Sequence, residues 1–204
     1  MKILFIPTKL RAKPNKSKIL EISKQLPKNI AIAYSIQYQD IASEINKILS
    51  KNHKITKFTQ VLGCSNPVFP QPTQAILLIG DGRFHATSLA IETKLPIYIL
   101  EKEKITKIKE QDINEFKTKQ KASYLKFLHS DKVGILVSTK PGQQNLKKAL
   151  QLKNKLKKKS YILIGNNLNT AEFENFGLDS YINTACPRLD MDDARVVNIN
   201  NIPQ

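Results

Sequence analysis

The chain has 204 residues, which is enough for one large domain or two small ones. Hydrophobic residues make up 41% of them, which allows a buried core and argues against wholesale disorder. No apolar run approaches the ~18–20 residues that cross a bilayer, and the short run at 2–6 does not resemble a signal peptide. We therefore expect a cytoplasmic protein without a membrane span.

The charge is strongly basic, because Lys and Arg outnumber Asp and Glu by 33 to 17 and give a formal net charge of +16. The positive electrostatic field of such a chain favours anionic partners, including nucleic acid, an RNA-bound protein or a phosphorylated ligand. The alternative is a generally lysine-rich composition, since the lysines are scattered. The one dense run, at 153–159, ends a predicted helix, where cations suit the helix dipole. We favour this second interpretation for most of the charge.

Short apolar strands alternate with helical segments in the first half of the chain. The apolar runs predict strands at 2–6, 29–35, 54–61, 75–82 and 96–100. Helical spacing of apolar residues predicts helices at 17–26, at 40–49 and from about residue 85. The segment 65–72 is rich in proline and is predicted to be a loop.

The second half repeats this alternation. We expect a long helix at 102–130, then strands at 133–138, 161–165, 180–185 and 196–199, with helices at 145–158 and 170–176 between them. Alternating strands and helices with short loops predict an α/β fold. We predict two related domains, 1–101 and 102–204, each a small parallel sheet flanked by helices.

Two cysteines follow predicted strands, Cys64 after 54–61 and Cys186 after 180–185. Ligands of parallel sheets gather at the carboxyl ends of the strands, so both thiols are expected at a functional edge. Two thiolates from separate domains could share one iron–sulfur cluster if the domains faced each other. The alternative is that each is a small buried apolar residue, and the absence of a C-x-x-C pair leaves both interpretations open. A disulfide is not expected in a reducing compartment.

A glycine-rich turn follows the strand at 75–82, with the sequence Gly80-Asp81-Gly82-Arg83-Phe84-His85. Its glycines permit positive φ angles and a close approach to a ligand. Asp81 could accept hydrogen bonds from a ligand, and Arg83 could pair with a carboxylate. The alternative is an ordinary turn in which Asp81 caps the next helix. His85 has no partner at metal-ligand spacing and is more typical of a structural residue.

A second candidate loop, Ser138-Thr139-Lys140-Pro141-Gly142-Gln143, follows the strand at 133–138. It lacks the spacing of a phosphate-binding loop, yet its hydroxyls, Lys140 and the next helix start could hold an anion or a carboxylate. After Cys186 come Arg188 and three acidic residues, Asp190, Asp192 and Asp193. The simplest interpretation of these carboxylates is a solvated acidic turn.

The motifs VLGC, GDGRFH, VSTKPGQ and NTACPRLDMDD occur in this order along the chain. Together they resemble the 2-(3-amino-3-carboxypropyl)histidine synthase family of diphthamide biosynthesis, from the first strand to Asp193. The resemblance implies three homologous α/β domains that each give one cysteine to a single 4Fe–4S cluster, whose open iron binds S-adenosylmethionine. It also implies an aminocarboxypropyl radical that attacks a histidine of translation elongation factor two. Archaeal members are homodimers and eukaryotic members are heterodimers.

Transferred to this chain, the resemblance makes Cys64 the second cluster ligand and Cys186 the third. The residues that it implies as walls of the S-adenosylmethionine site are Gly80, Asp81, Gly82, Arg83, Phe84, His85, Ser138, Thr139, Lys140, Gln143 and Arg188. The family's first domain has no counterpart in these residues. We therefore expect an oligomeric enzyme in which a separate chain supplies the first domain and the third cysteine.

Two other functions are kept open. The chain could be a non-catalytic accessory subunit of the same complex, in which its cysteines hold a secondary cluster or none. It could also be a basic RNA-binding α/β module. Aromatic residues make up only 7% of the chain and Trp is absent, so a stacking platform for bases is not indicated.

Overall fold

The computed structural model describes residues 4, 6–62, 65, 67–81 and 83–202. The chain forms two compact units, residues 1–113 and 114–204, and the division falls inside helix α4 (Glu110–His129). This differs from the predicted boundary at Glu101, because strand β5 (Lys104–Lys107) pairs with β4 (Ile97–Glu101) and belongs to the first sheet. In both units a mainly parallel sheet is flanked by helices, which confirms the predicted α/β fold class.

The first unit contains a five-stranded sheet in the order β2-β1-β3-β4-β5. Its central strands are β1 (Asn29–Tyr34) and β3 (Ala75–Ile79), which are buried almost throughout, and β2 (Lys54–Gln60) lies at one edge. Continuous apolar runs suit strands that are covered on both faces. All neighbouring strands are parallel except β4 and β5, which form an antiparallel hairpin.

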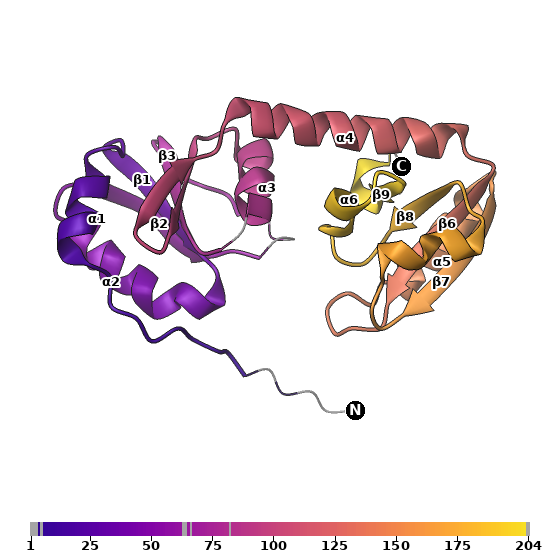
Figure 1. Ribbon diagram of the computed structural model, residues 1–204, viewed down its shortest axis with the longest axis horizontal. Helices are drawn as coiled ribbons and strands as arrows, with labels where there is room; N and C mark the ends of the chain where they lie inside the picture. Colours follow the sequence, from indigo (N-terminus) through magenta and orange to yellow (C-terminus); the bar gives the residue numbers. More distant parts are fainter. Residues whose placement is uncertain (1–3, 5, 63–64, 66, 82, 203–204) are drawn as a thin grey trace. The chain divides into compact units, whose positions relative to one another are not determined.

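Helices cover both faces of this first sheet (Figure 1). Successive residues of β1 point alternately into the hydrophobic cores on the two faces. Ile30 and Ile32 pack with helices α1 (Lys16–Ser23) and α2 (Gln39–Leu49). Ala31 and Ala33 pack on the other side with helix α3 (Arg83–Thr93). The 3₁₀ turn η1 (Ile36–Tyr38) connects β1 to α2.

Two predictions for this unit are wrong. Leu4 and Ile6 are 83% and 77% exposed and lie outside any strand, so the described part of 2–6 is not a buried strand; residues 2, 3 and 5 lie outside the described residues. The predicted long helix at 102–130 begins only at Glu110. Lys102 instead adopts a positive φ of 47°, which allows the tight turn from β4 into β5.

The second unit contains a four-stranded parallel sheet in the order β7-β6-β8-β9. The strands are β6 (Lys132–Ser138), β7 (Lys159–Gly165), β8 (Ser180–Asn183) and β9 (Val196–Asn198), and they agree with the predicted positions. The carboxyl-terminal half of α4 and helix α5 (Leu146–Lys155) cover one face.

The opposite face of the second sheet packs against the 3₁₀ helix η2 (Thr170–Phe176) and the short helix α6 (Leu189–Asp192). The sequence predicted the helix at 170–176 but not α6, which lies beside β9 (Figure 1). A last 3₁₀ turn, η3 (Ile199–Asn201), follows β9. Within the described ranges, no helix is both long and apolar enough to cross a bilayer.

Candidate functional site

In the first unit, the candidate residues follow three neighbouring parallel strands. Cys64 comes after β2, Ser35 and Tyr38 after β1, and Gly80 and Asp81 after β3, in the sheet order β2-β1-β3. Because these strands are parallel, their carboxyl ends share one edge of the sheet. Cys64 and Gly82 lie outside the described residues, so the predictions made for them remain predictions.

Tyr38 and Asp81 form a contact at this edge that the sequence analysis missed. The Tyr38 hydroxyl donates a hydrogen bond to Oδ2 of Asp81, across 43 residues of chain. Burial of the phenol, together with the hydrogen bond and negative charge of Asp81, raises the pKa of Tyr38 to about 12. Tyr38 therefore stays protonated at neutral pH and holds the exposed Asp81 carboxylate in one orientation.

Gly80 is buried and packs against Ser35 at the same edge. A Cβ atom added at Gly80 would lie 2.8 Å from Ser35 Oγ, so glycine is needed here for close approach within the protein. Gly80 does not use the positive φ that glycine permits, since among the described glycines only Gly142 and Gly177 have positive φ. Ser35 Oγ is buried and makes no hydrogen bond within the described part of the chain.

The remaining residues of the glycine-rich turn begin helix α3. Arg83 is 77% exposed and lies 3.9 Å from Asp112, so the ion pair that it makes is weak. Phe84 and His85 are half-buried, and their ring centroids lie 5.5 Å apart in an edge-on arrangement. The structure therefore places Asp81 close to Tyr38, while Arg83 is turned toward α4.

In the second unit, Cys186 is a free, half-buried thiol that follows β8. The strand is extended past its end by Thr184, whose backbone N and Oγ1 both donate to the Leu136 carbonyl, at 3.2 and 2.7 Å. The Asn145 carboxamide donates to the Thr184 carbonyl at 2.6 Å. Cys186 therefore lies where the sequence predicted, at the carboxyl edge of the sheet.

The Ser138 loop lies at the same edge, because β6 and β8 are neighbours. Ser138 is buried; its hydroxyl donates to the Asn166 carbonyl at 3.2 Å and accepts from Lys140 N at 3.1 Å. The hydroxyl thus braces the loop. Thr139 and Lys140 are exposed and Gln143 is half-buried, so these three are the side chains that could contact an anion.

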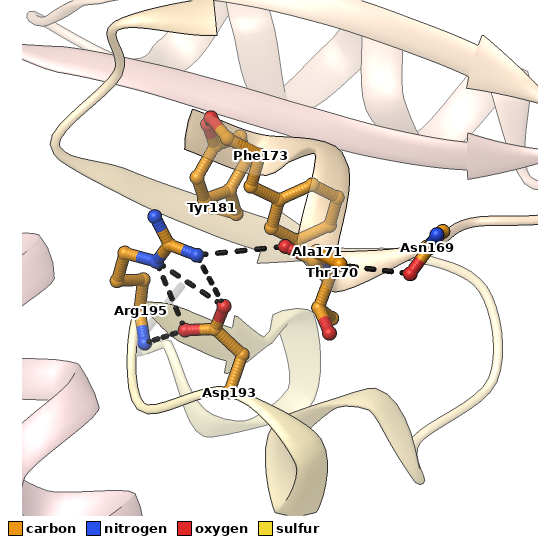
Figure 2. Close-up of polar contacts among 7 residues, drawn as sticks. All are labelled: Asn169, Thr170, Ala171, Phe173, Tyr181, Asp193 and Arg195. Atoms are coloured by element: carbon orange, nitrogen blue, oxygen red, sulfur yellow. Dashed lines mark hydrogen bonds and ion pairs between the residues drawn. The ribbon is translucent and has the colours of Figure 1, made fainter. Parts of the chain in front are cut away.

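Two of the acidic residues after Cys186, Asp190 and Asp193, do not form the solvated turn that we expected, and the side chain of Asp192 lies outside the described part of the structure. Arg188 is exposed, but Asp190 is 5% exposed and the Asp193 side chain 12%. Arg195 Nε and Nη2 bond the Asp193 carboxylate (Figure 2). Burial opposes the charge of Asp193, but the hydrogen bonds and charge of Arg195 outweigh it and lower the pKa of Asp193.

Comparisons with known proteins agree with these motifs. The sequence model of the family described as "Putative diphthamide synthesis protein" matches residues 1–196. The chain belongs to this diphthamide synthesis family. It is 33% identical over 138 residues to a 2-(3-amino-3-carboxypropyl)histidine synthase of Pyrococcus horikoshii, covering 66% of this chain and 40% of that protein. It is 30% identical over 207 residues to the synthase of Methanocaldococcus jannaschii, covering 95% of this chain and 57% of that protein.

A solved structure shares the fold. The crystal structure of Dph2 from Pyrococcus horikoshii with a 4Fe–4S cluster matches with a TM-score of 0.76 and 26% identity, covering 91% of this chain and 59% of that one. The chain thus spans less than two thirds of the length of the family members that it matches.

One thiol of the described residues suits an iron–sulfur cluster. Such clusters are held by cysteine thiolates, and Cys186 is free, partly accessible and fixed at a strand exit. Within the described ranges, no group of three or more His, Cys, Asp or Glu residues gathers into a complete ligand set. Cys186 therefore fits one ligand position of such a cluster.

Proposed function

We propose that this chain is part of a cytoplasmic diphthamide synthase, which transfers the 3-amino-3-carboxypropyl group of S-adenosylmethionine to a histidine of translation elongation factor two. Family membership and the names of the relatives support this reaction. The observation that carries the proposal is the free Cys186 thiol at the carboxyl edge of the second sheet, within the region matched to the family. The two sheets correspond, in this proposal, to the second and third domains of the family.

Cys64 and Cys186 would hold the 4Fe–4S cluster together with a third thiolate from a separate chain in the same oligomer. When bound, the cluster supplies the electron that cleaves the sulfonium. The chain's own residues would bind and orient the substrate. In the first unit, Asp81 is exposed and oriented by Tyr38, so it can accept hydrogen bonds from an ammonium group.

In the second unit, Lys140 and Thr139 are exposed beside the Cys186 edge and can bind a carboxylate. Ser138 contributes indirectly, because its buried hydroxyl fixes the backbone of Lys140. The other residues of the two motifs, Gly80, Gly82, Arg83, Phe84, His85, Gln143 and Arg188, complete the proposed substrate walls.

The test is co-expression with the part of the Methanocaldococcus jannaschii relative that this chain does not cover, followed by anaerobic reconstitution with iron and sulfide. Two readouts are the visible absorption of the cluster and cleavage of S-adenosylmethionine. Cys186→Ala is expected to abolish both. Unchanged cleavage in this variant would overturn the catalytic assignment and leave an accessory subunit.

Ser180→Ala is the matched control. Like Cys186→Ala, it removes one heavy atom, and it does so at the opposite end of β8. Ser180 is fully buried and its hydroxyl makes no hydrogen bond within the described residues, so its loss leaves no partner unsatisfied. Both readouts should match the unsubstituted protein.

A further inference from the structure

A pair of asparagine side chains joins the ends of β8 and β9 beside Cys186. Asn183 and Asn198 are directly paired residues of these parallel strands, and Asn183 is only 2% exposed. Asn183 Nδ2 donates to Asn198 Oδ1 at 2.6 Å and to the Cys186 carbonyl at 2.6 Å. Asn183 Oδ1 accepts from Ala185 N at 2.9 Å. Both N–H groups and the oxygen of this carboxamide are therefore used.

Asn198 extends the network away from the sheet. Its Nδ2 donates to the Pro187 carbonyl at 2.9 Å and to Asp190 Oδ2 at 2.7 Å. The same Asp190 oxygen accepts from Gln120 Nε2 of helix α4 at 3.1 Å. The chain Asn183–Asn198–Asp190–Gln120, which we call the amide ladder, thus links β8, β9, α6 and α4 within the second unit.

The amide ladder holds three consecutive backbone positions, at Ala185, Cys186 and Pro187. These residues lie beyond the last sheet pair, so the sheet itself does not fix them. With the backbone on both sides of the thiol held, the sulfur position depends only on the rotation about one side-chain bond. Hydrogen bonds of this kind, made behind the ligand, orient the ligands of metal sites.

We propose that Asn183 and Asn198 are positioning residues, which hold the Cys186 thiolate in the geometry that an iron–sulfur cluster requires. This inference rests on the proposed function of Cys186 as a cluster ligand. Both asparagines hydrogen-bond backbone atoms of the Cys186 segment, so they act on the thiol through that backbone. Loss of either side chain should loosen the thiol without removing it.

The first test uses the full chain without a cluster. Native-state alkylation by iodoacetamide is followed by mass spectrometry of the peptide that contains Cys186. Asn183→Ala and Asn198→Ala are expected to speed alkylation by about tenfold, because lost hydrogen bonds raise the population of the open segment. Asn145→Ala is the matched control: it removes a carboxamide bonded to the Thr184 carbonyl, which makes no hydrogen bond to residues 185–187 within the described part of the chain.

The second test uses the reconstituted complex described above. Asn183→Ala and Asn198→Ala are expected to release iron to a chelator about tenfold faster and to broaden the electron paramagnetic resonance signal of the reduced cluster. Asn145→Ala should leave the rate of iron release and the width of the signal unchanged, although it should lower the thermal stability about as much as the ladder variants do. If the ladder variants behave like Asn145→Ala in alkylation, iron release and spectrum, the ladder is only a structural brace and the inference is overturned.

The two proposals fail separately. A cluster that survives Cys186→Ala removes the ligand assignment and, with it, the positioning role. A cluster lost in Cys186→Ala but unaffected in both ladder variants removes the positioning role alone. Should the asparagine variants not fold, Gln120→Ala replaces them, since Gln120 is half-buried at the far end of the ladder. The rates of alkylation and of iron release should then rise about two- to threefold, roughly the effect of weakening one hydrogen bond.

Discussion

Arg195 binds both carboxylate oxygens of Asp193, with Nε and Nη2 contacts of 2.7 to 3.1 Å (Figure 2). The Arg195 backbone N donates to the same carboxylate at 2.7 Å, and Nη2 reaches the Thr170 carbonyl at 3.5 Å. The pair therefore ties the connection between α6 and β9 to the start of η2. Beside it, Tyr181 stacks on Phe173 with ring centroids 4.2 Å apart.

Arg195→Ala should lower the free energy of unfolding by ~1–3 kcal/mol, because it leaves a largely buried carboxylate without its guanidinium donors. Urea denaturation at neutral pH measures this change. Arg188→Ala, which removes an exposed arginine from the connection between β8 and α6, is the control and should change the free energy by less than about 0.5 kcal/mol. Equal effects of the two substitutions would contradict a special role for the pair.

The same pair predicts an acid dependence. The pKa of Asp193 is lowered from its ordinary value of 3.8, so its contribution to stability is present above that pH and is lost as the pH falls below it. In Arg195→Ala, the guanidinium hydrogen bonds and charge are lost, while burial, the backbone N–H of residue 195 and the charge of Lys126 still act on Asp193. The pKa of Asp193 should therefore rise, and this part of the pH dependence should become weaker. Unfolding free energies at several pH values between neutral and about 3 compare the two proteins. Parallel curves would show that Arg195 does not set the charge of Asp193.

Tyr38 predicts an alkaline dependence in the first unit. Its pKa is raised from 10.0 to about 12, so the folded state binds the phenol proton more tightly than the unfolded state. The stability that this provides is full below pH 10 and is lost as the pH rises toward 12. Ultraviolet titration of tyrosinate, compared with Tyr38→Phe, isolates this one phenol among the six tyrosines.

Asp81→Asn separates the two causes of the raised pKa. It removes the negative charge beside Tyr38 but leaves the burial, so the Tyr38 titration should move to lower pH without reaching its ordinary value. A titration that is unchanged by Asp81→Asn would mean that the hydrogen bond between these two side chains does not form in solution.

Secondary-structure elements with an unambiguous apolar pattern were predicted well. Strands β1, β3 and β6 are apolar runs of a length and composition that suit buried strands, and each begins within one residue of its predicted start. The segment at 102–107 failed because Ile105 and Ile108, three residues apart, also fit a helix. Only the antiparallel pairing of Ile105 with Leu100 decides for a strand.

The sequence located the candidate site along the chain but not the contacts that hold its residues in place. A cysteine after an apolar run signals a strand exit, which located Cys186. Asn183, Asn198 and Tyr38 were missed, because their roles depend on contacts between residues far apart in sequence. Gly134 shows the same limit: a Cβ there would lie 2.6 Å from the Tyr181 ring, and nothing in the sequence near Gly134 records that neighbour.

The contact between Gly80 and Ser35 predicts how tightly the carboxyl edge of the first sheet is packed. Gly80→Ala should lower the free energy of unfolding by about 1 kcal/mol, since the added Cβ would lie 2.8 Å from Ser35 Oγ. The Ser35 backbone N is bonded to the Ile79 carbonyl at 3.3 Å, so the side chain must move instead.

Ser35→Ala supplies the control, because it removes the oxygen that the new methyl group meets and leaves Ser35 Cβ at an ordinary 3.7 Å. Ser35→Ala alone should be nearly neutral, since its hydroxyl makes no hydrogen bond within the described residues. In the double variant, the cost of Gly80→Ala should largely disappear, giving a coupling of about 1 kcal/mol in a double-mutant cycle. If Gly80→Ala costs the same in both backgrounds, the close approach of these two residues is not the reason for glycine at this position.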